Sequence, residues 1–175
     1  MTATGLSRRD RFACLVRALT RWWAYGGGIV IFGLVAVNVY SVAGALFFGR
    51  PFPGVYEVVQ VGAAVAMFMF LPYGQATGAN ITADIFTSAM PRRAVVFLGA
   101  LGAFFGLALA AFLLWRMSEG ARDVYTYRET TAIYQFPIWY AYGPILASLA
   151  LWVLAAATNL LQASRGVLPE EVDGP

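Results

Sequence analysis

The sequence contains no histidine and no lysine, and Cys14 is its only cysteine. Without histidine the chain has no imidazole for haem ligation, metal binding or general base catalysis. A single cysteine excludes an internal disulfide, a Cys-x-x-Cys redox pair and a thiolate metal cluster. No G-x-x-x-x-G-K-[ST] motif is present, which argues against ATP hydrolysis. We therefore expect a chain that is not an enzyme and that holds no cofactor or metal of its own.

Charged residues are also scarce. They make up 12% of the chain, whereas hydrophobic residues make up 60%, and the mean hydropathy is +0.67. A soluble domain carries about 25% charged and about 45–50% apolar residues. The composition therefore predicts a multi-pass membrane protein. The arginines are spread along the chain rather than gathered on one face, so we expect membrane lipids, and no nucleic acid, among its partners.

Four charge-poor windows are long enough to cross a bilayer, whose hydrocarbon core of about 30 Å needs about 20 helical residues. They cover residues 25–48, 56–76, 93–117 and 137–162. The expected fold is an all-α membrane protein with four transmembrane helices in one domain, 1–175. The last segment, 163–175, is acidic and contains proline and glycine, and we expect it to be a flexible tail.

The segment 7–23 has a helical pattern of its own. Its apolar side chains fall within about a third of a helix circumference, and Arg17 and Arg21 point away from them. These apolar residues are Phe12, Leu15, Val16, Leu19, Trp22 and Trp23. The pattern predicts an amphipathic helix lying on the membrane surface, anchored by Arg17, Arg21, Trp22 and Trp23. An unstructured basic leader is the alternative.

A second amphipathic segment, 80–90, lies between the second and third windows. Ile81, Ile85 and Ala89 recur at helical spacing, and Asn80 is suited to cap the N-terminus of such a helix. Asp84 is favoured near that end by the helix dipole, and Pro91 would stop the helix. We expect a short surface elbow, after which Arg92 and Arg93 anchor the third helix at the membrane surface.

Arginine placement predicts the orientation. Eight arginines lie before the first window, between the second and third, or after the fourth: Arg8, Arg9, Arg11, Arg17, Arg21, Arg92, Arg93 and Arg165. Four lie on the opposite side, at Arg50, Arg116, Arg122 and Arg128. Because positive charge is enriched in cytoplasmic segments, both termini are expected in the cytoplasm.

A few polar or small residues stand out within the windows. Glu57, near the start of the second, is either a functional carboxylate or a structural one favoured by the helix dipole and paired with Arg50. Asn38 interrupts the first window and suggests an interface. Gly102, Gly106 and Ala110 share one face of the third, and predict close contact with a helix of this chain or of another subunit.

Several motifs, in order, resemble those of the DctQ-type small membrane subunit of tripartite ATP-independent periplasmic (TRAP) transporters. That family has an acid near the start of its second helix, as at Glu57. It then has a Gly-x-His-Ile-x-x-Asp elbow that closes in Leu-Pro and an Ile-Pro-x-Trp-x-x-Tyr segment that opens its fourth helix. The elbow matches Gly78, Asn80, Ile81, Asp84 and Pro91, and the later segment matches Pro137, Trp139 and Tyr142. Asn80 replaces the common histidine, so a role that needs an imidazole is in doubt.

The resemblance implies a small permease or scaffold subunit of a Na⁺-coupled, binding-protein-dependent transporter that imports an organic acid across the bacterial inner membrane. It also implies a large DctM-type membrane subunit, which would hold Na⁺ and substrate, and a periplasmic substrate-binding protein. The sequence shows no internal repeat of the kind on which transporter cores are often built. The alternatives are a small autonomous proton-coupled exporter that uses Glu57, or the membrane anchor of a respiratory enzyme.

Overall fold

The computed structural model describes residues 8–50, 52–77 and 92–163. Its helices are α1 (Arg8–Phe48), α2 (Val55–Ala76), α4 (Arg92–Tyr127) and α5 (Trp139–Ala163). All four contain a stretch that is long and apolar enough to cross a membrane. The expected all-α membrane fold is therefore confirmed, and each helix overlaps one of the windows expected from hydropathy. The predicted elbow at 80–90 and the tail at 163–175 fall outside the described residues, apart from Ala163 at the end of α5.

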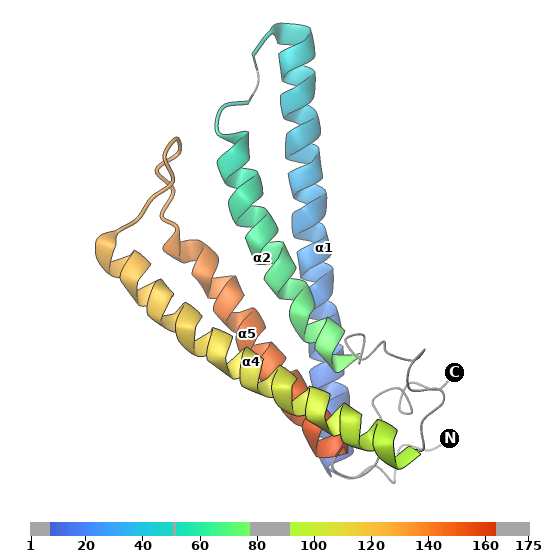
Figure 1. Ribbon diagram of the computed structural model, residues 1–175. Coiled ribbons are helices and arrows are strands. Elements are labelled where there is room, and N and C mark those ends of the chain that lie inside the picture. The colour runs from blue at the N-terminus through green and yellow to red at the C-terminus, as the bar shows by residue number, and fades with distance from the viewer. Residues whose placement is uncertain (1–7, 51, 78–91, 164–175) are drawn as a thin grey trace.

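The helices form two antiparallel pairs, α1–α2 and α4–α5. In addition, α2 packs against α5, and α1 touches α5. The pairs lie close together where α1 begins and α5 finishes, and they spread apart toward the opposite end (Figure 1). We call these the terminal end and the loop end. The loop end contains the turn 49–54 and the loop 128–138, so residues far apart in sequence can meet there.

The separate surface helix expected over 7–23 is instead the first part of α1, a continuous helix of 41 residues. No glycine or proline interrupts the chain between Trp23 and Tyr25, so nothing breaks the helix at the expected boundary. Val16 is buried with Ala76 and Ala155, which places one side of this segment against protein. At about 1.5 Å per residue α1 is about 60 Å long, roughly twice the hydrocarbon thickness.

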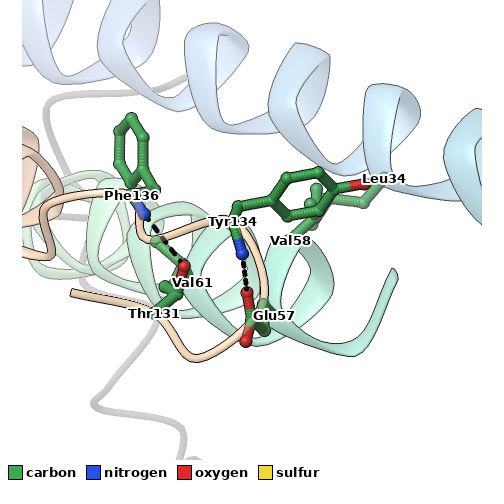
Figure 2. Close-up of a pocket in the computed structure, with 8 residues that line it drawn as sticks. Leu34, Glu57, Val58, Val61, Thr131, Tyr134 and Phe136 are labelled. Carbon is green, nitrogen blue, oxygen red and sulfur yellow. Dashed lines mark hydrogen bonds between the residues drawn. The ribbon is translucent and has the colours of Figure 1, made fainter. Parts of the chain in front are cut away.

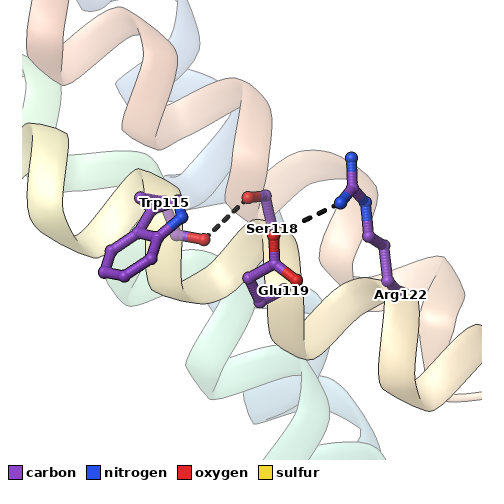
Figure 3. A network of polar contacts seen from close by, with 4 residues as sticks. All are labelled: Trp115, Ser118, Glu119 and Arg122. Atoms are coloured by element: carbon purple, nitrogen blue, oxygen red, sulfur yellow. Dashed lines mark hydrogen bonds and ion pairs between the residues drawn. The ribbon is translucent and has the colours of Figure 1, made fainter.

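Helix α4 also runs past its expected end at residue 117, because it continues to Tyr127. Its last turns carry an ion pair between Arg122 and Glu119, with 3.3 Å between nitrogen and oxygen (Figure 3). One turn earlier, the Ser118 hydroxyl donates to the carbonyl of Trp115 at 2.7 Å. This surface pair has the i, i+3 spacing of neighbours on a helix face, and it suits a helix that leaves the membrane at the loop end.

Small residues allow the helices to approach closely. A Cβ on Gly62 would lie 2.6 Å from Leu34, and one on Gly106 would lie 3.2 Å from the Gln75 amide. Ala110 is fully buried in the cluster formed by α4 and α5. In a membrane, where lipid removes most of the hydrophobic drive for association, such close packing is a main source of helix–helix attraction.

Gly106 and Gly102 provide a matched test of this packing. A Cβ on Gly102 has no neighbour within 4 Å, whereas one on Gly106 meets Gln75. We expect Gly106→Leu to destabilise the chain by about 1–3 kcal/mol through overpacking. Gly102→Leu should leave the stability nearly unchanged. Thermal unfolding of the two purified variants in one detergent measures the difference, and equal melting temperatures would contradict the packing described here.

Candidate functional site

The most distinctive polar contact of the molecule joins α2 to the loop between α4 and α5. Glu57 lies in the first turn of α2, where the helix dipole favours a carboxylate. Its Oε1 accepts a hydrogen bond from the Ile133 N–H at 2.7 Å. Its Oε2 accepts one from the Tyr134 N–H at 3.2 Å, which Figure 2 shows. The donors are 76 and 77 residues away in sequence. We call this contact the Glu57 latch.

Several other N–H groups of the loop are bonded internally. Thr131 N–H donates to the Phe136 carbonyl at 3.0 Å, and Ile138 N–H donates to the Glu129 carbonyl at 3.1 Å. Phe136 N–H donates to the Thr131 hydroxyl at 3.1 Å. The N–H groups of Ile133 and Tyr134 instead donate to Glu57. This acceptor is charged, which strengthens both bonds.

Tyr134 fastens the same loop to the turn before α2. Its hydroxyl donates to the Pro53 carbonyl at 2.6 Å, and its ring lies 6.2 Å from that of Phe52. Gly54 is required beneath this ring for two reasons. Its φ is 70°, a value that glycine adopts without strain, and a Cβ there would lie 2.5 Å from the Tyr134 ring. The latch is thus supported by an aromatic contact and a tight turn.

The turn before α2 is also attached to α1. Phe52 N–H donates to the Ser41 hydroxyl at 3.2 Å, and the Phe52 ring meets that of Tyr40 edge-on at 6.1 Å. A continuous set of contacts therefore runs from α1 through the turn to the loop. It spans the region where the two helix pairs spread apart.

A cavity of about 560 Å³ lies beside the latch. Its lining comes from α1, α2 and the loop: Leu34, Glu57, Val58, Val61, Gly62, Thr131, Tyr134 and Phe136. The carboxylate of Glu57 and the hydroxyl of Thr131 are already engaged by loop N–H groups, and the other lining side chains are mostly apolar. None of the described lining residues is basic, so these side chains offer no counter-charge to an organic anion. The arrangement supports a structural role rather than a substrate site.

A second polar cluster lies at the terminal end and is buried. The Trp152 indole N–H donates to Gln75 Oε1 at 3.2 Å, and the Asn159 amide donates to the backbone carbonyl of Gln75. The last carbonyls of a helix have no partner within it, so Asn159 satisfies a group that α2 leaves open. We call these three residues the Gln75 node. It joins α2 to α5, and Gly106 of α4 packs against it.

A third contact joins α1 to α5. The Trp23 indole N–H donates to the Ser148 hydroxyl at 2.8 Å, and that hydroxyl donates to the Pro144 carbonyl at 2.7 Å. Ser148 is buried, so its pairing avoids the cost of an isolated hydroxyl in an apolar environment. Trp23, expected as a membrane-surface anchor, makes this contact within the chain.

The other residues singled out from the sequence have varied surroundings. Trp139 begins α5 and stacks on Tyr140 with 3.9 Å between ring centroids, while Pro137 forms an isolated bridge with Thr130. The Tyr142 side chain lies close to Gly120 of α4. A Cβ added to Gly120 would be 3.5 Å from the Tyr142 hydroxyl. Arg21 and Trp22 are exposed, and Arg17 is half-buried.

Three contacts expected from the sequence have different outcomes in the structure. Among the described residues Glu57 makes no ion pair with Arg50, because its carboxylate is taken up by the loop tip, which the sequence could not place beside it. Of the small-residue face on α4, Gly106 and Ala110 pack within this chain, whereas Gly102 is exposed. Asn38 is exposed and donates to the Leu34 carbonyl of its own helix at 3.1 Å.

Part of the predicted site lies outside the described residues. This part comprises the elbow residues Gly78, Asn80, Ile81, Asp84 and Pro91. Arg92 and Arg93 begin α4, but only their helical backbone is described. Within the described ranges no three histidine, cysteine, aspartate or glutamate side chains gather where they could hold a metal ion.

The match to a known family decides what kind of protein carries these contacts. A family model described as the DctQ component of tripartite ATP-independent periplasmic transporters matches residues 34–166. The chain belongs to the DctQ family. The matched region contains both the Glu57 latch and the Gln75 node, and it confirms the resemblance found in the sequence. No curated protein and no solved structure matches this chain. As a DctQ component it is a multi-pass membrane subunit of a transporter, in a family of transporter components rather than enzymes.

The sequence did not single out the Gln75 node or the role of Tyr134 in this DctQ protein. Gln75 and Asn159 are polar residues at the ends of apolar windows, and that position is a usable signal of a helix–helix contact. Tyr134 gave no such signal, because its partners, Pro53 and Gly54, are far away in sequence.

The latch predicts how the loop responds to changes at Glu57. Glu57→Gln keeps one acceptor oxygen but loses the charge and the second acceptor, and Glu57→Ala loses both. We expect amide hydrogen exchange at Ile133 and Tyr134 to accelerate in the order wild type, Gln, Ala. The acceleration should be about tenfold or less, because such bonds have a modest net value. Glu119→Gln is the matched control, and exchange at the loop that is equal in all four proteins contradicts the latch.

The Gln75 node predicts a difference between two glutamines of α2. Gln75→Leu leaves the Trp152 N–H unpaired in the buried core, which should cost about 1–3 kcal/mol of stability. Gln60 is exposed, so Gln60→Leu should not destabilise the isolated chain. Thermal unfolding in detergent measures both, and the prediction fails when Gln75→Leu melts no lower than Gln60→Leu.

Proposed function

We propose that this chain is the scaffold subunit of a Na⁺-coupled, binding-protein-dependent transporter that imports an organic acid across the bacterial inner membrane. It would stabilise and orient a large DctM-type membrane subunit, and that subunit would hold the Na⁺ and substrate sites. A periplasmic substrate-binding protein would deliver the acid. The chain itself would need no cofactor.

The observation that carries this proposal is the use of the polar side chains inside the helix pairs. Glu57 holds the loop, the Gln75 node holds α2 to α5, and Ser148 holds α1 to α5. A transport pathway needs polar or ionisable groups that face a water-filled cavity and exchange partners. In the part of the chain that the structure describes, the buried side chains of Gln75, Ser148 and Asn159 instead fasten one helix to another, and those of Thr20 and Thr158 bond to their own helices. This arrangement supports a scaffold rather than an autonomous exporter.

A reconstitution experiment tests the proposal. The chain, its large subunit and the binding protein are placed in proteoliposomes singly and together, with a Na⁺ gradient and radiolabelled small carboxylates. We expect Na⁺-dependent uptake only when all three are present. Robust uptake by this chain alone would contradict the scaffold function and favour the autonomous exporter.

The proposed orientation places the loop end in the periplasm and the terminal end in the cytoplasm, as the arginine distribution suggests. Cys14 is exposed and is the only cysteine, so labelling can test this directly. In intact cells, a membrane-impermeant maleimide should not label Cys14. It should label Tyr127→Cys in a Cys14→Ser background, because Tyr127 is exposed at the loop end. The reverse labelling pattern means the opposite orientation.

A further inference from the structure

The α1–α2 pair exposes two amide side chains within its apolar helices. Asn38 of α1 and Gln60 of α2 are both exposed. The Asn38 amide nitrogen donates to the Leu34 carbonyl of its own helix at 3.1 Å, which leaves its side-chain oxygen and a second N–H to be satisfied. Among the described residues the Gln60 side chain makes no hydrogen bond.

The two amides lie at nearly the same depth. Leu34 of α1 meets Gly62 of α2, which fixes the register of this antiparallel pair. Asn38 and Gln60 both lie on the loop-end side of that contact, within about one turn of each other. Asn38 precedes Phe48, the last residue of α1, by a rise of about 15 Å. With the loop end of α1 at the bilayer boundary, this distance puts Asn38 within a hydrocarbon core about 30 Å thick.

An amide at this depth cannot be left facing lipid without cost, because acyl chains neither donate nor accept hydrogen bonds. Membrane proteins usually satisfy such groups by hydrogen bonds to a neighbouring helix. The exposed amides therefore point to a protein neighbour rather than to lipid.

The outer surface of α4 is different. From Leu98 to Trp115 every described position that is exposed carries an apolar residue. The large ones are Leu98, Leu101, Phe104, Phe105, Leu109, Phe112 and Trp115. Apart from the Trp115 indole, such a surface has no side-chain hydrogen-bonding groups that need a partner, so it can face acyl chains. The small-residue contact of α4 is also used already, because Gly106 and Ala110 pack inside this chain.

We propose that the large membrane subunit docks on the exposed side of α1–α2 that carries Asn38 and Gln60, which we call the amide face. A transmembrane segment of that subunit supplies hydrogen-bonding groups to both amides, and the outer surface of α4 faces lipid. This inference rests on the proposed function, because it specifies where the proposed partner binds.

Co-purification in mild detergent tests the amide face. The double variant Asn38→Leu, Gln60→Leu removes both amides without disturbing a contact between helices of this chain. We expect its recovery of the large subunit to fall roughly three- to tenfold, as the loss of one or two interhelical hydrogen bonds predicts. The matched control, Phe104→Leu, Phe105→Leu on α4, should recover as much as the wild type. A larger loss in the control than in the amide variant overturns the proposal.

Photo-cross-linking gives a second readout that does not depend on weakened binding. A photoreactive residue replaces either Val35, which is 54% exposed near Asn38, or Phe105, which is 63% exposed on α4. The probe at 35 should yield a product with the large subunit, and the probe at 105 should not. A product from 105 alone, or a product at 35 between two copies of this chain, overturns the docking face while leaving the scaffold function intact. When the wild-type chain recovers no large subunit at all, the proposed function itself fails.

Discussion

The structure depends on one constraint: a polar group inside a membrane protein must find a partner within the protein, because lipid offers none. In this DctQ chain the constraint acts on the buried polar groups at the terminal end. Helix α2 leaves carbonyl groups open at its C-terminus, and Asn159 donates to that of Gln75. At the loop end the contact is exposed, and Glu57 accepts hydrogen bonds from two N–H groups of the loop tip. Each pairing joins α2 to a different part of the chain.

These pairings explain how two helix pairs that spread apart can still form one body. At the terminal end, the Gln75 node and the contact of Val16 with Ala76 and Ala155 hold α1, α2 and α5 together. At the loop end, where the helices are farther apart, the loop crosses the gap and the Glu57 latch fixes its tip. The V-shaped arrangement in Figure 1 is therefore braced at both ends. This bracing is consistent with the proposed scaffold role.

The sequence predicted the helices well, because each span is a long apolar run that few other structures accommodate. It predicted less about their surroundings. The apolar arc around Val16 is the same whether it faces head groups or protein, so the sequence indicated a surface helix where the structure has the first part of α1. Glu57 was recognisable as a residue with a special role, but its partners were not, since Ile133 and Tyr134 are brought to it only by the packing of α5 against α2. Hydropathy carries no information about such long-range contacts.

The same limit explains why the two candidate partner faces could be separated only with the structure. In the sequence, the small-residue stripe of α4 and the amide of Asn38 are both ordinary signals of helix contact. Packing within the chain uses Gly106 and Ala110 but leaves Asn38 bonded only to its own helix. The small residues of α4 that pack within the chain are explained by the fold. The Asn38 amide is not, so we look for its partner in another subunit. This reasoning is why we propose that Asn38 and Gln60, which the chain leaves exposed, mark the docking face.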